Sequence, residues 1–105
     1  MQHPLQVTFH NLPHSDALEA DVRSRFAKLE ALHERLIGAR VVIDSPHRTP
    51  VNTGKTYAVR IELQLPGHEL VVSREPVGEF RIALNDAFAT ARRRLKEFLA
   101  KQREA

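Results

Sequence analysis

The sequence predicts an α+β fold, a two-layer β-α-β-β-β-α sandwich in which two helices pack on one face of a four-stranded sheet. Two observations predict it. Apolar and polar residues alternate in four short segments, as in half-buried strands, and apolar residues recur every three or four positions in two longer segments, as in amphipathic helices. No repeat, low-complexity segment or linker interrupts this order, so we expect residues 1–105 to form a single domain.

The first strand and the first helix are expected in the first third of the chain. Apolar and polar residues alternate over residues 5–10, and the turn-forming residues 11–13 end this strand. Asp16 and Glu19 have the three-residue spacing of a capping box. They predict that the first helix begins at about Asp16 and runs to Leu32 or slightly beyond.

Three more strands are expected in the middle of the chain. Residues 39–44 are rich in the β-branched side chains that suit a pleated surface, and the turn chemistry of residues 45–54 predicts a loop after them. Residues 57–65 show the clearest alternation of the whole chain. Pro66-Gly67 then predicts a tight turn, so residues 68–74 are expected to return as the antiparallel partner of that strand.

The last helix is expected after Gly78, because the apolar residues that follow fall within about 100° of a helical wheel. These residues are Phe80, Leu84, Ala87, Phe88, Ala91, Leu95, Phe98 and Leu99. Residues 79–105 carry seven bases and four acids, whereas residues 1–52 carry six of each. The excess positive charge therefore lies near the C-terminal end, and polyanions are the first partners to consider.

The sheet face opposite the helices is expected to be polar. It would carry residues such as Gln6, Thr8, Arg40, Asp44, Arg60, Glu62 and Gln64. This face lacks the aromatic residues on which single-stranded RNA stacks its bases in RNA-recognition sheets. Any nucleic-acid contact is therefore assigned to the helices.

The composition excludes several classes of protein. The chain has no cysteine, which excludes thiol catalysis, thiolate metal sites and disulfides. Residues 1–13 lack the pattern of a secretory signal, and the chain has no run of eighteen apolar residues. We expect a cytoplasmic protein with no membrane partner.

No set of catalytic or metal-binding residues is apparent. His10 and His14 are four residues apart, but Pro13 between them interrupts the helical geometry that gives such a pair of ligands its common face. No serine lies in a glycine-flanked nucleophile turn, and no glycine-rich loop is present to hold phosphates. We therefore expect no enzymatic activity, no metal, no cofactor and no small-molecule substrate.

The basic residues of the two helices are the candidate binding residues. Arg81, Arg92, Lys96 and Arg103 share one flank of the last helix with Asn85, and Arg25, Lys28 and, if the helix extends, Arg35 share one side of the first. If the helices lie side by side, these rows would form a broad basic surface. Such a surface suits the spaced phosphates of folded RNA better than it suits a small anion, and Arg48 and Lys55 would extend it. The alternative is a solvated surface in which Glu97 pairs with Arg93 and Lys101.

Several segments resemble the bacterial ribosome hibernation-promoting and ribosome-associated inhibitor proteins, also described as sigma-54 modulation proteins. These are Arg25-Phe26-Ala27-Lys28-Leu29-Glu30, Glu34-Arg35-Leu36 before Val41-Val42-Ile43, and Ala83-Leu84 followed by Arg93 and Leu95. A short branch of the family is similar at residues 45–47, 59–63, 66–72 and 86–88. The resemblance covers nearly the whole chain and depends on the order of the segments.

The resemblance implies the same sandwich fold and a non-enzymatic translation inhibitor of stressed or stationary-phase cells. It implies binding of the small ribosomal subunit near the decoding region, contact with 16S rRNA through the basic helices, and a block of mRNA and tRNA binding. Arg25, Lys28, Arg35 and Arg93 match basic positions of the family, and charge geometry adds Arg48, Lys55, Arg81, Arg92, Lys96 and Lys101. Because the chain lacks the dimerisation domain of the long family members, we expect a monomer.

Two other functions are compatible with the sequence. One is a general double-stranded RNA-binding protein that presents its helices to A-form grooves. The other is a protein interaction module that regulates a transcription or signalling factor through an acidic partner surface.

Overall fold

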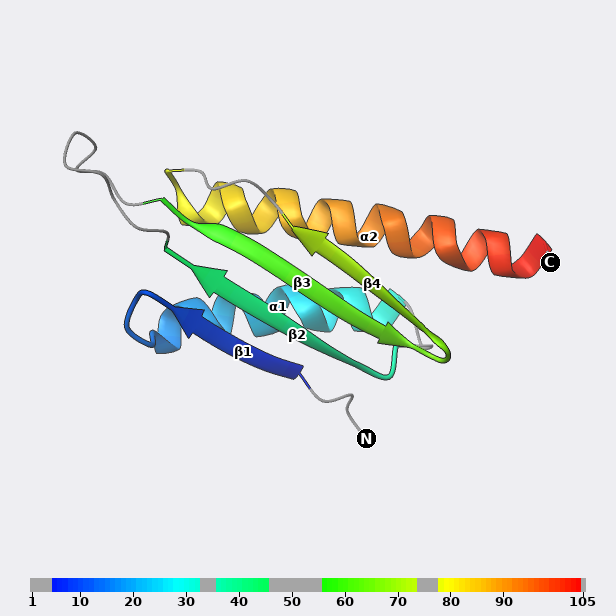
Figure 1. Cartoon of the computed structure of the whole chain (residues 1–105), viewed down its shortest axis with the longest axis horizontal. Coiled ribbons are helices and arrows are strands. Elements are labelled where there is room, and N and C mark those ends of the chain that lie inside the picture. The colour runs from blue at the N-terminus through cyan, green and yellow to red at the C-terminus, as the bar shows by residue number, and fades with distance from the viewer. Residues whose placement is uncertain (1–4, 33–35, 46–55, 74–77, 105) are drawn as a thin grey trace.

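The computed structural model describes residues 5–32, 36–45, 56–73 and 78–104. Within these ranges the elements follow in the predicted order (Figure 1): β1 (Leu5–His10), α1 (Asp16–Leu32), β2 (Gly38–Asp44), β3 (Ala58–Leu65), β4 (His68–Ser73) and α2 (Phe80–Glu104). The boundaries agree with the sequence prediction to within one or two residues. Three predicted features lie outside the described residues: any extension of the first helix into residues 33–35, most of the loop after β2, and Arg74 at the end of the fourth strand.

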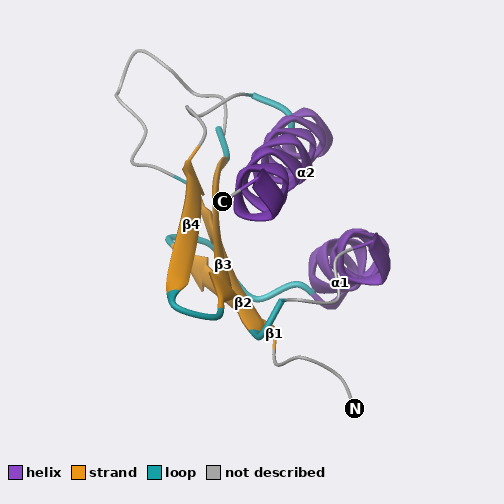
Figure 2. Cartoon of the chain, turned by 90° about the vertical axis from the view of Figure 1, so that its right-hand side faces the viewer, coloured by secondary structure: helices purple, strands orange, loops and turns teal. Residues whose placement is uncertain are grey.

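The four strands form one mixed sheet in the order β1-β2-β3-β4. β1 runs parallel to β2, whereas the other two neighbouring pairs are antiparallel. Val7, Val41, Ile61 and Val72 lie opposite one another across the strands, and the last three are buried. Figure 2 shows both helices on the same side of this sheet. The predicted two-layer sandwich is therefore confirmed.

The hydrophobic core lies between the sheet and the helices. α2 packs on β3 and β4, and α1 contacts β1 and α2. From α1 the core receives Val22, Phe26 and Leu29, which follow the three- and four-residue spacing of one helix face. From α2 it receives Ala83, Leu84, Ala87, Phe88, Ala91 and Leu95. Burial of these two helix faces fixes which side chains of each helix remain on the outer surface.

The outer face of the sheet is polar, as predicted. Gln6, Arg40 and Glu62 lie opposite one another, and Arg60 Nε donates a hydrogen bond to Glu62 Oε2 over 2.9 Å. All six aromatic residues of the chain belong to the core or pack against it: Phe9, Phe26, Tyr57, Phe80, Phe88 and Phe98. The described strands therefore present no phenylalanine, tyrosine or tryptophan ring to a nucleobase on the outer face, and His10 at the end of β1 is the aromatic side chain found there.

The start of α1 differs from the sequence prediction. The backbone N–H of Leu18 donates to Ser15 Oγ over 3.2 Å, so Ser15 is the N-cap and the predicted Asp16–Glu19 capping box is wrong. Glu19 Oε2 instead accepts from Arg23 Nε over 2.8 Å, and Glu19 Oε1 lies 2.7 Å from His14 Nε2. The hydrogen bond with His14, followed by that with Arg23, lowers the pKa of the Glu19 carboxyl.

Each edge strand of the sheet meets an arginine from a helix. Arg23 Nη2 donates to the carbonyl of Leu5 in β1 over 3.4 Å, and Arg94 Nη1 donates to the carbonyl of Val71 in β4 over 2.7 Å. Free edge carbonyls are sites where a strand of another chain can pair. These two arginines therefore stabilise the fold, and we do not count them among the basic residues of the candidate RNA surface.

No helix in the described part of the chain has an apolar stretch long enough to cross a bilayer.

The cap of α1 gives a stability prediction. We expect Ser15→Ala to lower the free energy of unfolding by about 1 kcal/mol, because the N–H of Leu18 loses its acceptor. Urea denaturation measures the change. Ser24→Ala is the control, since Ser24 is exposed within the same helix and alanine favours helix interiors. Equal stability of the Ser15→Ala protein and the wild type would contradict this assignment of the cap.

Candidate nucleic-acid interface

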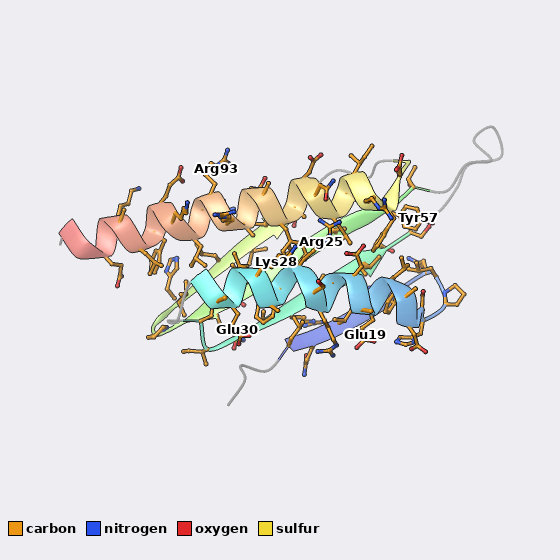
Figure 3. All side chains as sticks on the ribbon, turned by 180° about the vertical axis from the view of Figure 1, so that it is seen from behind. Glu19, Arg25, Lys28, Glu30, Tyr57 and Arg93 are labelled. Atoms are coloured by element: carbon orange, nitrogen blue, oxygen red, sulfur yellow. The ribbon has the colours of Figure 1, made fainter. Side chains whose placement is uncertain are left out.

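The two helices lie side by side on the sheet, and basic residues of α1 face α2. Figure 3 shows Arg25 and Lys28 between the two helices. Both residues stand next to the buried positions Phe26 and Leu29, so packing of the apolar face turns this side of α1 towards α2. Arg25 and Lys28, the two described members of the row predicted on the first helix, therefore face the second helix.

Arg25 connects the two helices. Its Nε atom donates to Asp21 Oδ1 over 2.9 Å, one turn earlier in α1, and its Nη1 atom donates to Asn85 Oδ1 in α2. The Arg25 side chain is 24 % exposed, so this contact is partly shielded from solvent. Asp21 neutralises much of the charge of Arg25. We assign Arg25 mainly to holding the helices in register.

A groove of about 250 Å³ opens between the helices beside this contact. Its lining combines apolar groups with polar and basic ones: Leu29, Phe88 and Ala89, then Asn85, and Arg25, Lys28 and Arg92. No carboxylate contributes to the lining. Lys28 and Arg92 were predicted on helix flanks that would lie side by side, and the structure brings both residues to the same groove.

Lys28 and Arg92 carry charges that the fold leaves available. Both side chains are exposed, and neither forms an ion pair with any residue that the structure describes. Two like charges around one groove repel each other, and this repulsion is relieved when an anion binds. The groove is therefore suited to a phosphate group, which the two cations can approach from opposite helices.

Two further bases extend this row along α2. Arg81 lies one turn before Asn85, and Lys96 lies one turn after Arg92. Both are exposed and have no ion pair within the described ranges. We call Lys28, Arg81, Arg92 and Lys96 the groove bases.

The other predicted bases are not part of this row. Arg93 points away from α1 (Figure 3), because successive residues of a helix are turned by about 100° and Arg92 already faces the groove. Lys101 lies about two turns after Arg94 and so shares the flank of α2 that faces β4. Arg35, Arg48 and Lys55 lie outside the described residues, as does the side chain of Arg103.

The alternative interpretation was a helix surface in which Glu97 pairs with Arg93 and Lys101. In the described part of the chain, Glu97 forms no ion pair with Arg93 or Lys101. In α1, by contrast, ion pairs with the i,i+4 spacing join Asp21 to Arg25 and Glu19 to Arg23. The basic side chains that the structure describes in α2 are therefore not neutralised by acids of the same helix.

Sequence reasoning missed the apolar part of the groove. Phe88 was expected only on the packed face of the last helix, and neither Leu29 nor Ala89 was predicted to line a binding surface. The i,i+4 spacing of Asp21 and Arg25 was the one local signal that Arg25 would be held by a carboxylate.

The described residues contain no group of three or more histidine, aspartate or glutamate side chains that could hold a metal ion. His14 contacts the carboxylates of Glu19 and Asp16, with nitrogen–oxygen distances of 2.7 and 3.5 Å. These contacts lie at the start of α1, next to the N-cap Ser15.

Comparison with known proteins identifies the fold and the family. No curated protein sequence matches the chain. A ribosomal subunit interface protein from Coxiella burnetii superposes with a TM-score of 0.75 at 11 % identity, covering 92 % of this chain and 98 % of that one. The N-terminal domain of protein Y from Thermus thermophilus superposes with a TM-score of 0.71 at 21 % identity, covering 92 % and 99 %. At these identities the likeness establishes a shared fold.

The family follows from the sequence itself. The model of a family described as "Sigma 54 modulation protein / S30EA ribosomal protein" matches residues 5–103, which is nearly the whole chain. This match confirms the resemblance found in the individual segments. The chain therefore belongs to the sigma-54 modulation protein / S30EA ribosomal protein family, a family of ribosome-associated proteins.

Proposed function

We propose that this protein binds the small ribosomal subunit through the groove bases and inhibits translation by occupying the space of mRNA and tRNA near the decoding region. The observation that carries the proposal is the convergence of Lys28 and Arg92 on one groove with no carboxylate in its lining. Family membership supplies the ribosome as the source of the polyanion. The RNA partner is then the 16S rRNA of that subunit.

The position of the charges supports RNA as the ligand. The groove bases Arg81, Arg92 and Lys96 span about four turns of α2, so they reach several phosphates along a backbone. The outer sheet face carries no phenylalanine, tyrosine or tryptophan in the described strands and only the imidazole of His10 at its edge, which disfavours a base-stacking platform there. Most of the affinity therefore comes from neutralised phosphates, and the helix side of the sandwich faces the RNA.

The mechanism is steric occlusion. The groove bases are exposed cations that position a rigid sandwich on RNA, and the groove lining contains no hydroxyl, thiol, imidazole or carboxylate side chain. A bound domain that fills the messenger path prevents translation without any chemical step. The protein would act as a cytoplasmic, monomeric factor of ribosome hibernation under stress.

Neutralising the groove tests this assignment. We expect Lys28→Gln combined with Arg92→Gln to weaken binding to small ribosomal subunits at least about tenfold, because hydrogen bonds to charged groups are lost. Fluorescence anisotropy of the labelled protein measures the affinity, and circular dichroism confirms that the fold is retained.

The matched control neutralises two arginines on the sheet face that lies away from the helices. Arg40→Gln combined with Arg60→Gln changes the net charge by the same amount but leaves the helices unchanged. The proposal expects little loss of affinity in this control. Equal weakening by the two double variants would show that only net charge matters and would contradict a defined surface on the helices.

The salt dependence of binding gives a second test. If the four groove bases each contact a phosphate, the logarithm of the affinity should fall against the logarithm of the salt concentration with a slope of about −3 to −4. The Lys28→Gln, Arg92→Gln variant should have about half that slope. Anisotropy titrations at several salt concentrations give both values. A slope near zero for the wild type would exclude phosphate neutralisation as the source of affinity.

A further inference from the structure

We propose that the groove between α1 and α2 holds a single unpaired nucleotide of the bound RNA, with its base on the apolar lining and its phosphate against Lys28 and Arg92. This inference rests on the proposed function and assigns a specific ligand to the groove. Contacts with a row of phosphates need only exposed lysine and arginine side chains. The groove offers in addition an apolar surface from Leu29, Phe88 and Ala89.

The size of the groove limits what can enter it. Its volume of about 250 Å³ lies below the range of roughly 300–1,000 Å³ typical of small-molecule and cofactor sites. A duplex cannot place a base in such a groove, because its bases are stacked and paired inside the helix. An unpaired nucleotide can turn its base away from the RNA and against the protein, as single-stranded RNA does on other surfaces.

The polar groups of the groove are donors. Asn85 Oδ1 already accepts from Arg25, which leaves the Nδ2 group of Asn85 without a partner among the described residues. Arg25, Lys28 and Arg92 have no acceptor atoms. A ligand of this groove must therefore bring acceptors, and both phosphate oxygens and the carbonyl oxygens of a base meet this requirement. Guanine and uracil carry such carbonyls, whereas the acceptors of adenine are ring nitrogens beside an amino donor.

The walls of the groove are set before a ligand arrives. Arg25 is hydrogen-bonded to Asp21 in its own helix and to Asn85 in the other, and this contact adds to the core packing that holds the two helices beside each other. A preformed site loses less conformational entropy on binding than one that must first be ordered. Ala89 keeps the groove open, because this exposed position has a small side chain where a larger one would cover the apolar lining.

Titrations with mononucleotides test the inference. Amide NMR spectra of the full chain would be recorded with uridine 5′-monophosphate, adenosine 5′-monophosphate and ribose 5-phosphate, which carry the same phosphate. We expect uridine monophosphate to bind at least about fivefold more tightly than ribose 5-phosphate, with shifts at Leu29, Phe88 and Ala89. Adenosine monophosphate should bind more weakly than uridine monophosphate, because its base has an amino donor where uracil has a carbonyl acceptor.

Filling the groove should remove this dependence on the base. Ala89→Phe places a ring over the apolar lining and should make uridine monophosphate and ribose 5-phosphate bind equally. Ala100→Phe is the matched control, since Ala100 is exposed on nearly the same stripe of α2, about three turns further along, and does not line the groove. Its preference for the nucleotide should match that of the wild type.

Three results would overturn the inference: equal binding of the nucleotide and ribose 5-phosphate by the wild type, an unchanged preference in Ala89→Phe, or equal binding of the two nucleotides. Binding of the wild type to small subunits is measured in parallel. If the protein binds subunits but the nucleobase does not change the affinity for the small ligands, the nucleotide site is wrong and the proposed function stands. If the wild type does not bind subunits, the proposed function is wrong and ribosomal RNA is not the source of the nucleotide.

Discussion

The parallel pairing of β1 with β2 is the constraint on which the rest of the structure depends. Parallel neighbours cannot be joined by a hairpin, so the chain must cross the sheet between them, and here it does so through α1. The antiparallel strands β3 and β4 then leave the other half of the same face uncovered. α2 packs on these two strands and comes to lie beside α1. The groove between the helices is a direct consequence of this topology.

Burial and charge are divided between the two sides of each helix. Val22, Phe26 and Leu29 bury one side of α1, and the packed side of α2 includes Leu84 and Leu95. Substitutions at exposed bases such as Lys28 or Arg92 therefore leave the core intact, which allows binding and stability to be tested separately. Arg25 is the exception, because its hydrogen bond to Asn85 joins the helices that form the groove.

The helices and strands could be predicted from the sequence more completely than the binding surface could. Alternation in residues 57–65 and helical spacing after Gly78 were sufficient for the strands and helices, because both patterns are local. The cap of α1 was misplaced by one residue, since Ser15 and Asp16 are both good caps and only the backbone geometry decides between them. Which bases face α1 depends on how the helices pack. Arg92 and Arg93 are adjacent in sequence, yet only Arg92 lines the groove.

A cryo-electron microscopy reconstruction of the protein on the small ribosomal subunit would test the central claim most directly. The account predicts that α1 and α2 face 16S rRNA in the messenger path, with Lys28 and Arg92 within hydrogen-bonding distance of RNA phosphates. The outer face of the sheet, with Arg40 and Arg60, should face away from the RNA. A reconstruction in which that sheet face meets the RNA, or in which the helices contact only ribosomal protein, would contradict it.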